Sequence, residues 1–379
     1  MRACLALALA LLSAGLTCAA AADDDLAARY DVEFAKRDKP LAAGDEYGGP
    51  LAWGESRVLR SLVQMAQVTG DTKYLDWFIR RFDAALALRD TELGRRSEFR
   101  RTLLPAWGSL KYSKDKYHVW AVHTGMITYP AALFVRHVRS DPALAHRYGA
   151  KADAYLRACR EALAAHDPEW FDGPGVGEGY YWDLYLRKHL PLNQQNAPGR
   201  TLVLMWLITG EGEYRDKASR LARFFKNRLR TRPDGAYDWA YWPELDDPTT
   251  SSEDISHASI NADFAALCAR HLSGDPERHP SGGRKGHGIV FSDDDMTRFA
   301  RTFTDHVHLG DGKFARNVSG EPEDDRYVGA LPRWLALAPW EPRVWQIVSD
   351  FERSQGGPKV PFAISSLLKW RPDGPTPEP

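Results

Sequence analysis

The sequence has few cysteines and almost no net charge. Only four cysteines occur in 379 residues. Cys4 and Cys18 lie near the N-terminus, so Cys159 and Cys268 are too few and too far apart to form a disulfide framework. Both stand in apolar, helix-like contexts, and we expect two buried thiols. The net charge of −1 gives no broad field that would recruit nucleic acid or an anionic membrane.

Long apolar runs are missing beyond the N-terminal segment. No later stretch reaches the roughly 18 apolar residues needed to cross a bilayer, so we expect no membrane insertion. The chain opens with Met1-Arg2, an apolar run and the small residues Ala19 to Ala22, a pattern typical of a signal peptide. We expect residues 1–22 to be removed and the protein to be periplasmic or secreted. Thr17 precedes Cys18 where a lipoprotein signal usually has Gly or Ala, which argues against a lipid anchor.

Several common chemical motifs are also absent. The sequence contains no Gly-x-Gly-x-x-Gly, no Walker loop, no His-Glu-x-x-His and no Gly-x-Ser-x-Gly. No cysteine pairs have the spacing of a zinc site. Dinucleotide, nucleotide, zinc-protease and serine-hydrolase chemistry are therefore disfavoured, and we expect neither a cofactor nor a metal.

Helical periodicity dominates what is present. Val58, Leu62 and Met65 share one face of a predicted helix, and the turns at Gly70 and Gly210 separate successive helices. Strand patterns are scarce, and the helix–turn–helix units are longer and less regular than those of short solenoid repeats. We therefore predict an all-α (α/α)6 or (α/α)7 toroid of helical hairpins over residues 23–370, followed by a Pro-rich tail at 371–379. Its long rim loops are predicted at Asp90–Lys116, Asp167–Tyr180, Arg230–Ser252, Gly274–Asp293 and Leu309–Glu323.

The junction between residues 237 and 261 has the strongest functional signal. Three aromatic residues, Trp239, Tyr241 and Trp242, precede an acidic, hydroxyl-rich loop. Ser251 or Ser252 is a possible cap for a helix whose first turn would hold Glu253 and Asp254. Acidic residues there are also explained by the helix dipole alone. Glu253, His257 and Asn261 follow at intervals of four, so a helix would place them on one face.

Three further clusters carry polar residues near predicted helix starts. His123 follows a long loop, although a histidine in such an apolar helix is also explained by packing. An apolar helix predicted at 201–208 is preceded by four consecutive amides, Asn193-Gln194-Gln195-Asn196, and by Arg200. The amides could bind a ligand or cap the helix. Arg316 lies in a polar loop, and Tyr327 begins another apolar segment.

At these residues the chain resembles the secreted (α/α)-toroid polysaccharide lyases, in particular the glucuronan and alginate lyases of polysaccharide lyase family 38. The resemblance rests on the hairpin pattern and on the two stretches Trp239-Ala240-Tyr241-Trp242 and Glu253-Asp254-Ile255-Ser256-His257-Ala258. It implies β-elimination in an anionic, uronate-containing polysaccharide. In that reaction one group neutralises the uronate carboxylate, a base removes the C5 proton and an acid protonates the leaving oxygen.

The resemblance also implies roles for individual residues. Proton transfer would fall to His257 with Tyr327 or Tyr241, and His123 would assist. Trp239 and Trp242 would form platforms for sugar rings. The uronate carboxylate would be bound by Glu253, Asn261, Asn196, Arg200 and Arg316.

Other functions remain open on the same fold. A glycoside hydrolase of the six-hairpin type would need two carboxylates, for which Asp254 with Glu178 or Asp183 are the candidates. A uronate C5-epimerase would share the proton abstraction without cleaving the chain. A non-catalytic glycan-binding protein would bind without turnover. A lyase product absorbs in the ultraviolet, whereas a hydrolase product does not.

Overall fold

The computed structural model describes residues 25–41, 44, 46–185, 187–243, 245, 251–272, 290–372 and 374. The signal peptide expected at 1–22, Cys18, most of the loop expected after Gly274 and the end of the tail lie outside these residues. None of the described helices is long and apolar enough to cross a membrane. Cys159 and Cys268 are free and buried, as the sequence predicts.

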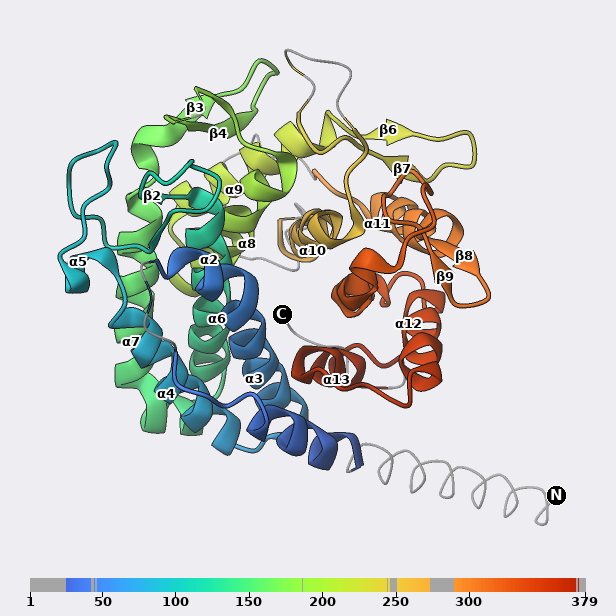
Figure 1. Ribbon diagram of the computed structural model, residues 1–379, viewed down its shortest axis with the longest axis horizontal. Coiled ribbons are helices and arrows are strands. Elements are labelled where there is room, and N and C mark those ends of the chain that lie inside the picture. The colour runs from blue at the N-terminus through green and yellow to red at the C-terminus, as the bar shows by residue number, and fades with distance from the viewer. Residues whose placement is uncertain are drawn as a thin grey trace.

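Six inner helices form a closed ring around a central axis (Figure 1). Each contacts the next along the chain, and the last, α13, returns to the first, α3. Ser365 of α13 donates a hydrogen bond to Gln64 of α3 at 2.8 Å, which joins the two ends of the ring. The inner helices are α3 (Ser56–Thr69), α6 (Ala121–Ser140), α8 (Leu192–Thr209), α10 (Ile255–His271), the 3₁₀ helix η4 (Asp325–Leu337) and α13 (Pro361–Lys369).

An outer helix packs behind each inner one. The helix at residues 25–35 packs beside α3, where the hydroxyl of Tyr30 lies 2.8 Å from that of Ser61. The described residues thus form six inner–outer pairs, which confirms the predicted all-α toroid and makes it an (α/α)6 arrangement. The other outer helices are α4 (Lys73–Leu86), α7 (Pro142–Ala164), α9 (Gly212–Lys226), α11 (Asp293–Arg301) and α12 (Arg343–Ser354).

The connections at the two ends of the toroid differ in length. The turns after the inner helices α3, α6, α8 and η4 are short, and two use a left-handed glycine, Gly70 at φ 71° and Gly210 at φ 73°. Residues 272–292, between α10 and α11, form a longer connection at the same end. The return connections, except the short one from α12 to α13, are long, and they gather at the rim where the inner helices begin. They contain the short helices α2 (Gly48–Pro50), η1 (Leu51–Glu55), α5 (Asp90–Leu93), η2 (Asp167–Glu169) and η3 (Thr302–Val307).

The rim loops also contain short antiparallel strand pairs. Strand β1 pairs with β2, β4 pairs with both β3 and β5, β6 pairs with β7, and β8 pairs with β9. Their bounds are β1 (Gly108–Ser109), β2 (His118–Val119), β3 (Trp170–Asp172), β4 (Gly179–Asp183), β5 (Lys188–His189), β6 (Arg230–Thr231), β7 (Tyr237–Asp238), β8 (His308–Gly310) and β9 (Lys313–Phe314).

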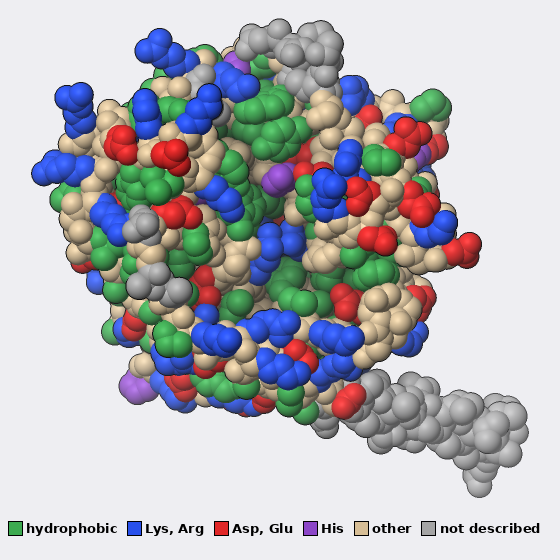
Figure 2. Space-filling model, viewed as in Figure 1, with side chains coloured by type: hydrophobic (Ala, Val, Ile, Leu, Met, Phe, Trp, Pro, Cys, Tyr) green, Lys and Arg blue, Asp and Glu red, His purple; other side chains and the backbone are tan. Residues whose placement is uncertain are grey.

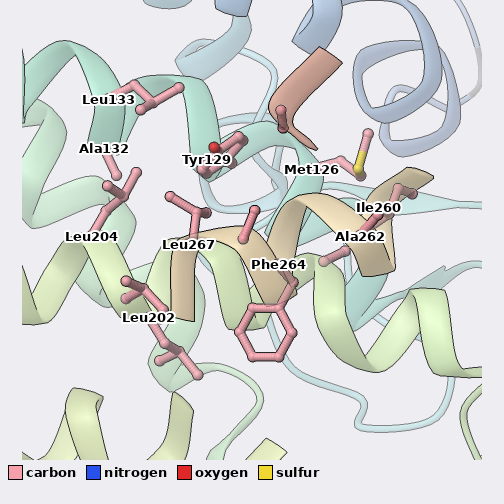
Figure 3. Close-up of a cluster of buried hydrophobic side chains, with 14 of the residues drawn as sticks. Met126, Tyr129, Ala132, Leu133, Leu202, Leu204, Ile260, Ala262, Phe264 and Leu267 are labelled. Carbon is pink, nitrogen blue, oxygen red and sulfur yellow. The ribbon is translucent and has the colours of Figure 1, made fainter. Parts of the chain in front are cut away.

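The core between α6, α8 and α10 is packed closely (Figure 3). A Cβ atom at Gly125 of α6 would lie 2.2 Å from the backbone nitrogen of Pro198, and one at Gly199 would lie 2.7 Å from the ring of Phe264. Any side chain at either glycine would push these helices apart. Because each inner helix begins at the rim, this packing also fixes the relative positions of their first turns.

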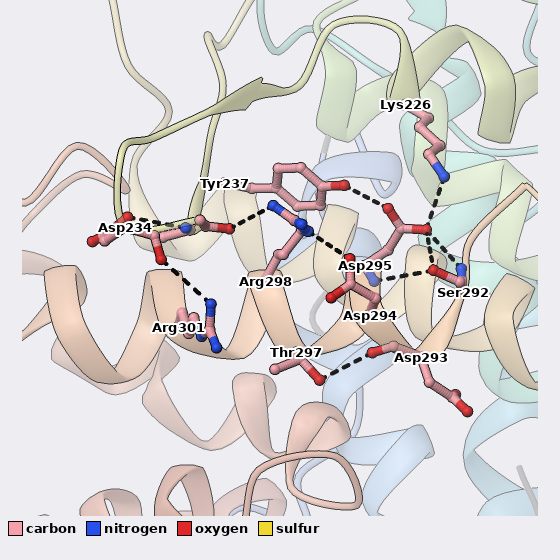
Figure 4. A network of polar contacts seen from close by, with 12 residues as sticks. Lys226, Asp234, Tyr237, Ser292, Asp293, Asp294, Asp295, Thr297, Arg298 and Arg301 are labelled. Atoms are coloured by element: carbon pink, nitrogen blue, oxygen red, sulfur yellow. Dashed lines mark hydrogen bonds and ion pairs between the residues drawn. The ribbon is translucent and has the colours of Figure 1, made fainter.

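The loop that leads into α10 is anchored to the outer helix α11. The carboxylate of Asp295 accepts hydrogen bonds from Tyr237 and, at 2.8 Å, from Lys226 (Figure 4). Ser292 caps α11, with its hydroxyl 3.2 Å from the backbone nitrogen of Asp295. This network holds β7 in place, and β7 is followed at once by the aromatic stretch that precedes α10.

Two inner helices begin at other residues than the sequence predicts. Helix α8 starts at Leu192, directly after Pro191, so the four consecutive amides lie inside its first turns and not in a loop before it. Asp254 itself caps α10, whereas Ser251 and Ser252 do not. Glu253 therefore lies in extended chain outside the helix, and the prediction that Glu253, His257 and Asn261 form one helical face is wrong.

Candidate functional site

The described polar residues of interest gather at the rim, at the first turns of the inner helices. Viewed from this side, the molecule is hollowed at its centre, and a histidine and several Lys or Arg side chains line the hollow (Figure 2). Backbone N–H groups at helix starts lack intrahelical partners and carry partial positive charge. A ring of such starts, with long loops above it, suits the binding of a ligand rich in oxygen atoms.

Asp254 and His257 form the best-defined pair in the hollow. One carboxylate oxygen of Asp254 accepts hydrogen bonds from the backbone nitrogens of Ser256 at 3.0 Å and His257 at 3.1 Å, which caps α10. The other oxygen lies 2.6 Å from Nδ1 of His257. Although burial alone would raise it, these hydrogen bonds and the imidazole lower the pKa of Asp254 below its usual value. The His257 side chain is 30% exposed, so part of the imidazole is accessible to solvent.

Glu253 has the opposite environment. Its side chain is fully buried, and its Oε2 accepts hydrogen bonds from Trp239 Nε1 and Asn261 Nδ2. Burial, reinforced by the charge of Asp254, raises the pKa of Glu253 well above its usual value despite these donors. The pKa values of these two consecutive carboxyl groups are therefore shifted in opposite directions.

Buried amides of α8 lie beside Glu253. Asn196 donates a hydrogen bond from Nδ2 to Asn261 Oδ1 at 2.7 Å, so Glu253, Asn261 and Asn196 form one chain of contacts. Asn196 Oδ1 and both side-chain atoms of Asn193 are buried and have no hydrogen-bond partner within the described part of the chain. Buried polar groups are normally satisfied, so these atoms are positioned to bind water or ligand hydroxyl groups.

His123 extends this set to α6. It is fully buried, and neither ring nitrogen has a hydrogen-bond partner among the described residues. Burial, with a smaller effect from Lys111, lowers the pKa of His123 to about 3, so the ring is neutral at physiological pH. Its ring centroid lies 6.2 Å from that of Trp53 and 6.0 Å from that of Tyr112.

Aromatic side chains flank His257. The ring centroids of Trp53 and Tyr241 lie 6.0 and 5.5 Å from the imidazole. Trp242 contacts Tyr241 at 5.4 Å and lies 3.6 Å below the ammonium group of Lys188. Burial raises the pKa of Tyr241 far above neutrality, so its hydroxyl keeps its proton. Trp53, Tyr241 and Trp242 are all partly exposed and can contact a sugar ring.

Three predicted site residues lie outside the cluster around His257. Trp239 is fully buried against Phe225 and Phe299, so its ring offers no face to a sugar. The carbonyl of Arg316 accepts a hydrogen bond from the backbone nitrogen of Ile255, while its side chain lies 3.7 Å from Asp324. Within the described residues, no hydrogen bond or ring contact joins Tyr327 to His257, and Tyr327 packs against the core.

Arg200 lies deeper, on the axis of the ring. It is buried and pairs with Asp263 at 2.9 Å, and Asp263 also binds Arg60 through both oxygens. The Arg200 guanidinium lies over the ring of Tyr129 at 4.5 Å. Arg200 is therefore part of an ion-pair network below the rim and is separate from the Glu253 cluster.

The two other carboxylates considered for a hydrolase have structural partners. Glu178 is buried and binds Asn227 and Arg228, which keep its pKa below the usual value although burial alone would raise it. Asp183 is buried 3.3 Å from Nε2 of His118. Neither contacts Asp254 in the described structure, so the acidic pair at the hollow is Glu253 with Asp254.

Sequence reasoning missed Trp53 and two arginines, Arg57 and Arg333. Trp53 lies in the π-helical turn η1 just ahead of α3, and no short motif marks it. The arginines line a cavity on the ring axis. In the sequence, these arginines could have been found as charged residues at otherwise apolar positions of the inner helices.

Comparison with known proteins supports the fold and corrects the family. No protein-family model and no curated protein sequence matches the chain. Among solved structures, the GH76A α-1,6-mannanase from Salegentibacter sp. HEL1_6 aligns with a TM-score of 0.51 at 11% identity, covering 84% of this chain and 88% of that one. A family 76 glycoside hydrolase from a bovine Bacteroides thetaiotaomicron strain aligns with a TM-score of 0.50 at 11% identity, covering 91% and 76%.

These structures overturn the resemblance to polysaccharide lyase family 38. The neighbours are glycoside hydrolases, and neither a family model nor a curated sequence supports a lyase. The predicted β-elimination of a glucuronan- or alginate-like polymer is therefore wrong. The lyase prediction arose because an acidic, histidine-containing and aromatic cleft suits several kinds of sugar chemistry.

Proposed function

We propose that this protein is a glycoside hydrolase acting on an oligosaccharide or polysaccharide. The observation that carries the proposal is the pair Glu253 and Asp254, two consecutive carboxyl groups whose pKa values are shifted in opposite directions. In such a pair the group with the raised pKa can act as the acid that glycoside hydrolysis requires, and the ionised group can supply or orient the base.

Glu253, Asp254 and His257 have different roles in the proposed reaction. In hydrolysis a water oxygen bonds to the anomeric carbon, the glycosidic C–O bond breaks, and the leaving oxygen takes a proton. Asp254 holds His257 through Nδ1 and leaves Nε2 free to accept the proton of that water. Glu253 retains a proton, and its Oε1 has no hydrogen-bond partner among the described residues. That atom is the proposed donor to the leaving group.

The surroundings of the pair also suit a sugar. Trp53, Tyr241 and Trp242 provide aromatic faces, and Asn193 and Asn196 provide unpartnered amide atoms for hydroxyl groups. Variants of the Salegentibacter mannanase described as inactive have two consecutive aspartates replaced, and they were solved with α-1,6-mannotriose or α-1,6-mannotetrose. These neighbours support a saccharide ligand and give no support to a uronate. Export, expected from residues 1–22, is part of the proposal.

The test measures bond cleavage and its chemistry together. Residues 23–379 would be incubated with a glycan panel that includes α-1,6-mannan and acidic polysaccharides, in water enriched in ¹⁸O. Hydrolysis places one heavy oxygen in each new reducing end, which mass spectrometry detects. Products lighter by one water molecule would contradict hydrolysis, as would binding without cleavage across the panel.

Variants then link the activity to the site. Glu253→Gln and His257→Gln are expected to lower kcat by about 100-fold or more, the usual effect of removing a general acid or base. His306→Gln is the matched control, because His306, in η3, also lies 2.6 Å from an aspartate, Asp234. Normal activity in Glu253→Gln and His257→Gln would refute the assignment.

A further inference from the structure

A small cavity lies on the axis of the toroid, below the rim cluster. Residues from all six inner helices line it, and its volume is about 30 Å³. That volume holds about two water molecules, so it excludes a sugar ring but admits a monatomic ion or one carboxylate group. The lining residues are Ser56, Arg57, Arg60, Met126, Tyr129, Pro130, Arg200, Ser259, Ile260, Arg333 and Phe362.

The charges around this arginine chamber (Arg57, Arg60, Arg200 and Arg333) do not balance. Asp263 neutralises part of the charge, binding Arg60 at 2.9 and 3.0 Å and Arg200 at 2.9 Å. No other carboxylate forms an ion pair with the four arginines within the described residues. Asp263 thus offsets part of the charge, and Asp254 acts on Arg333 from beyond ion-pair distance, so the chamber keeps an excess of positive charge.

Of the four chamber arginines, Arg57 and Arg333 form no ion pair with a carboxylate among the described residues. Arg333 donates to the hydroxyl of Ser256 at 2.9 Å and to its carbonyl at 3.4 Å. Arg57 has no hydrogen bond to another described residue, and its Nε is buried. Burial, followed by repulsion from Arg200, lowers the pKa of Arg57 to about 10. Burial, followed by repulsion from Arg57, also lowers the pKa of Arg333, although the charge of Asp254 opposes this shift.

We propose that the arginine chamber binds one small anion, with Arg57 and Arg333 as its principal donors. Guanidinium groups form strong, directional hydrogen bonds with anions, and both Arg57 and Arg333 are half-buried, so that an unpaired charge there has lost part of its hydration. The anion is either a free halide from solution or the acidic substituent of a saccharide that enters from the rim. The first source is independent of the proposed hydrolase activity, so failure of one proposal leaves the other testable.

Halide titration tests the free ion. The mature protein is titrated with sodium bromide in a zwitterionic buffer, the chamber variants show the effect of ionic strength alone, and the melting temperature is recorded. A saturable rise is expected, because a ligand that binds only the folded state stabilises it. In Arg57→Gln and Arg333→Gln the apparent bromide affinity is expected to fall by about tenfold or more, since each loses a charged donor. Arg353→Gln, at an exposed arginine on α12, is the control and should keep the wild-type response.

Two further measurements show where the anion binds and whether it comes from solution or from a saccharide. Anomalous scattering from bromide-soaked crystals should show a peak in the chamber. If bromide has no effect, a set of neutral and acidic oligosaccharides is titrated by calorimetry, and only acidic ones should bind, with loss of that binding in Arg57→Gln. The proposal is overturned if neither bromide nor acidic sugars bind, or if the binding survives in both chamber variants while circular dichroism shows them folded.

Discussion

The carboxylate of Asp254 holds the start of α10 with one oxygen and the imidazole of His257 with the other. The first oxygen accepts two backbone hydrogen bonds, at 3.0 and 3.1 Å, and the second lies 2.6 Å from Nδ1. The start of α10 and the orientation of the proposed base, His257, therefore both depend on this one side chain. Because the helix cap fixes the carboxylate, the orientation of His257 is set before any ligand arrives.

These two roles of Asp254 can be separated by substitution. Asp254→Asn keeps a good capping residue and should change the free energy of unfolding by less than about 0.5 kcal/mol, whereas Asp254→Ala should cost about 1 kcal/mol. Both lose the charge that orients His257, so both should lose most hydrolytic activity. Urea denaturation and initial rates provide the measurements. An Asn variant with full activity would show that Asp254 only caps the helix.

Glu253 is predicted to make the folded protein less stable as the pH rises. Its folded pKa lies well above the usual 4.5, so between these values the folded protein keeps a proton that the unfolded chain releases. Stability then falls with increasing pH. Glu253→Gln removes this effect, and its amide oxygen can still accept from Trp239 and Asn261. The free energy of unfolding of the variant minus that of the wild type should therefore be larger at pH 7.5 than at pH 4.5.

The same variant separates stability from activity. An inactive Glu253→Gln protein that is at least as stable as the wild type at neutral pH would indicate a functional carboxyl group. A variant that loses stability equally at both pH values would contradict the inferred protonation state. Glu92→Gln, at a carboxylate that is 47% exposed and paired with Arg89, is the control.

The hairpin architecture was readable from the sequence because it rests on local signals. Apolar residues repeat with helical spacing, and Gly70 and Gly210 stop two inner helices at the left-handed turns that the structure contains. The number of hairpins depends instead on closure, in which α13 returns to α3 through Ser365 and Gln64. Those residues are separated by some 300 positions, and no periodicity reports such a contact.

The site was predictable only in part, for a related reason. Glu253, Asp254 and His257 are neighbours in sequence, and they stay neighbours in the folded chain. Trp53 reaches His257 only because the ring brings α3 opposite α10. Trp239 has the composition of a sugar platform, but its position behind Glu253 is decided by packing against α11. Aromatic content in a loop thus indicates a cleft without saying which rings face it.

Asp263 is predicted to be essential for stability. It is buried and is the acidic partner of both Arg60 and Arg200. Asp263→Asn leaves two buried guanidinium groups without a counter-charge and should cost about 3–5 kcal/mol in the free energy of unfolding. Asp153→Asn, which removes an exposed ion pair with Arg139, should cost less than about 1 kcal/mol. Equal losses in urea denaturation would contradict the central role of Asp263.

Lys369 is predicted to make the folded protein more stable as the pH rises above 7. Its ammonium group is buried near Arg60 and Arg270 and donates to Gln67 at 2.8 Å. Burial, followed by repulsion from those arginines, lowers its pKa from 10.5 to about 7. Between these values the unfolded chain keeps a proton that the folded protein has released, so stability increases with pH.

Lys369→Met removes this titration. The stability of the wild type relative to the variant should therefore rise between pH 7 and pH 10, by on the order of 4 kcal/mol for a fully buried group. Urea denaturation at pH 7, 8.5 and 10 measures the difference. Lys359→Met, at an exposed lysine that donates to the carbonyl of Gln355, should give a curve parallel to the wild type. A parallel curve for Lys369→Met would mean that Lys369 stays charged in the folded protein, and the ring would then hold one more positive charge beside the arginine chamber.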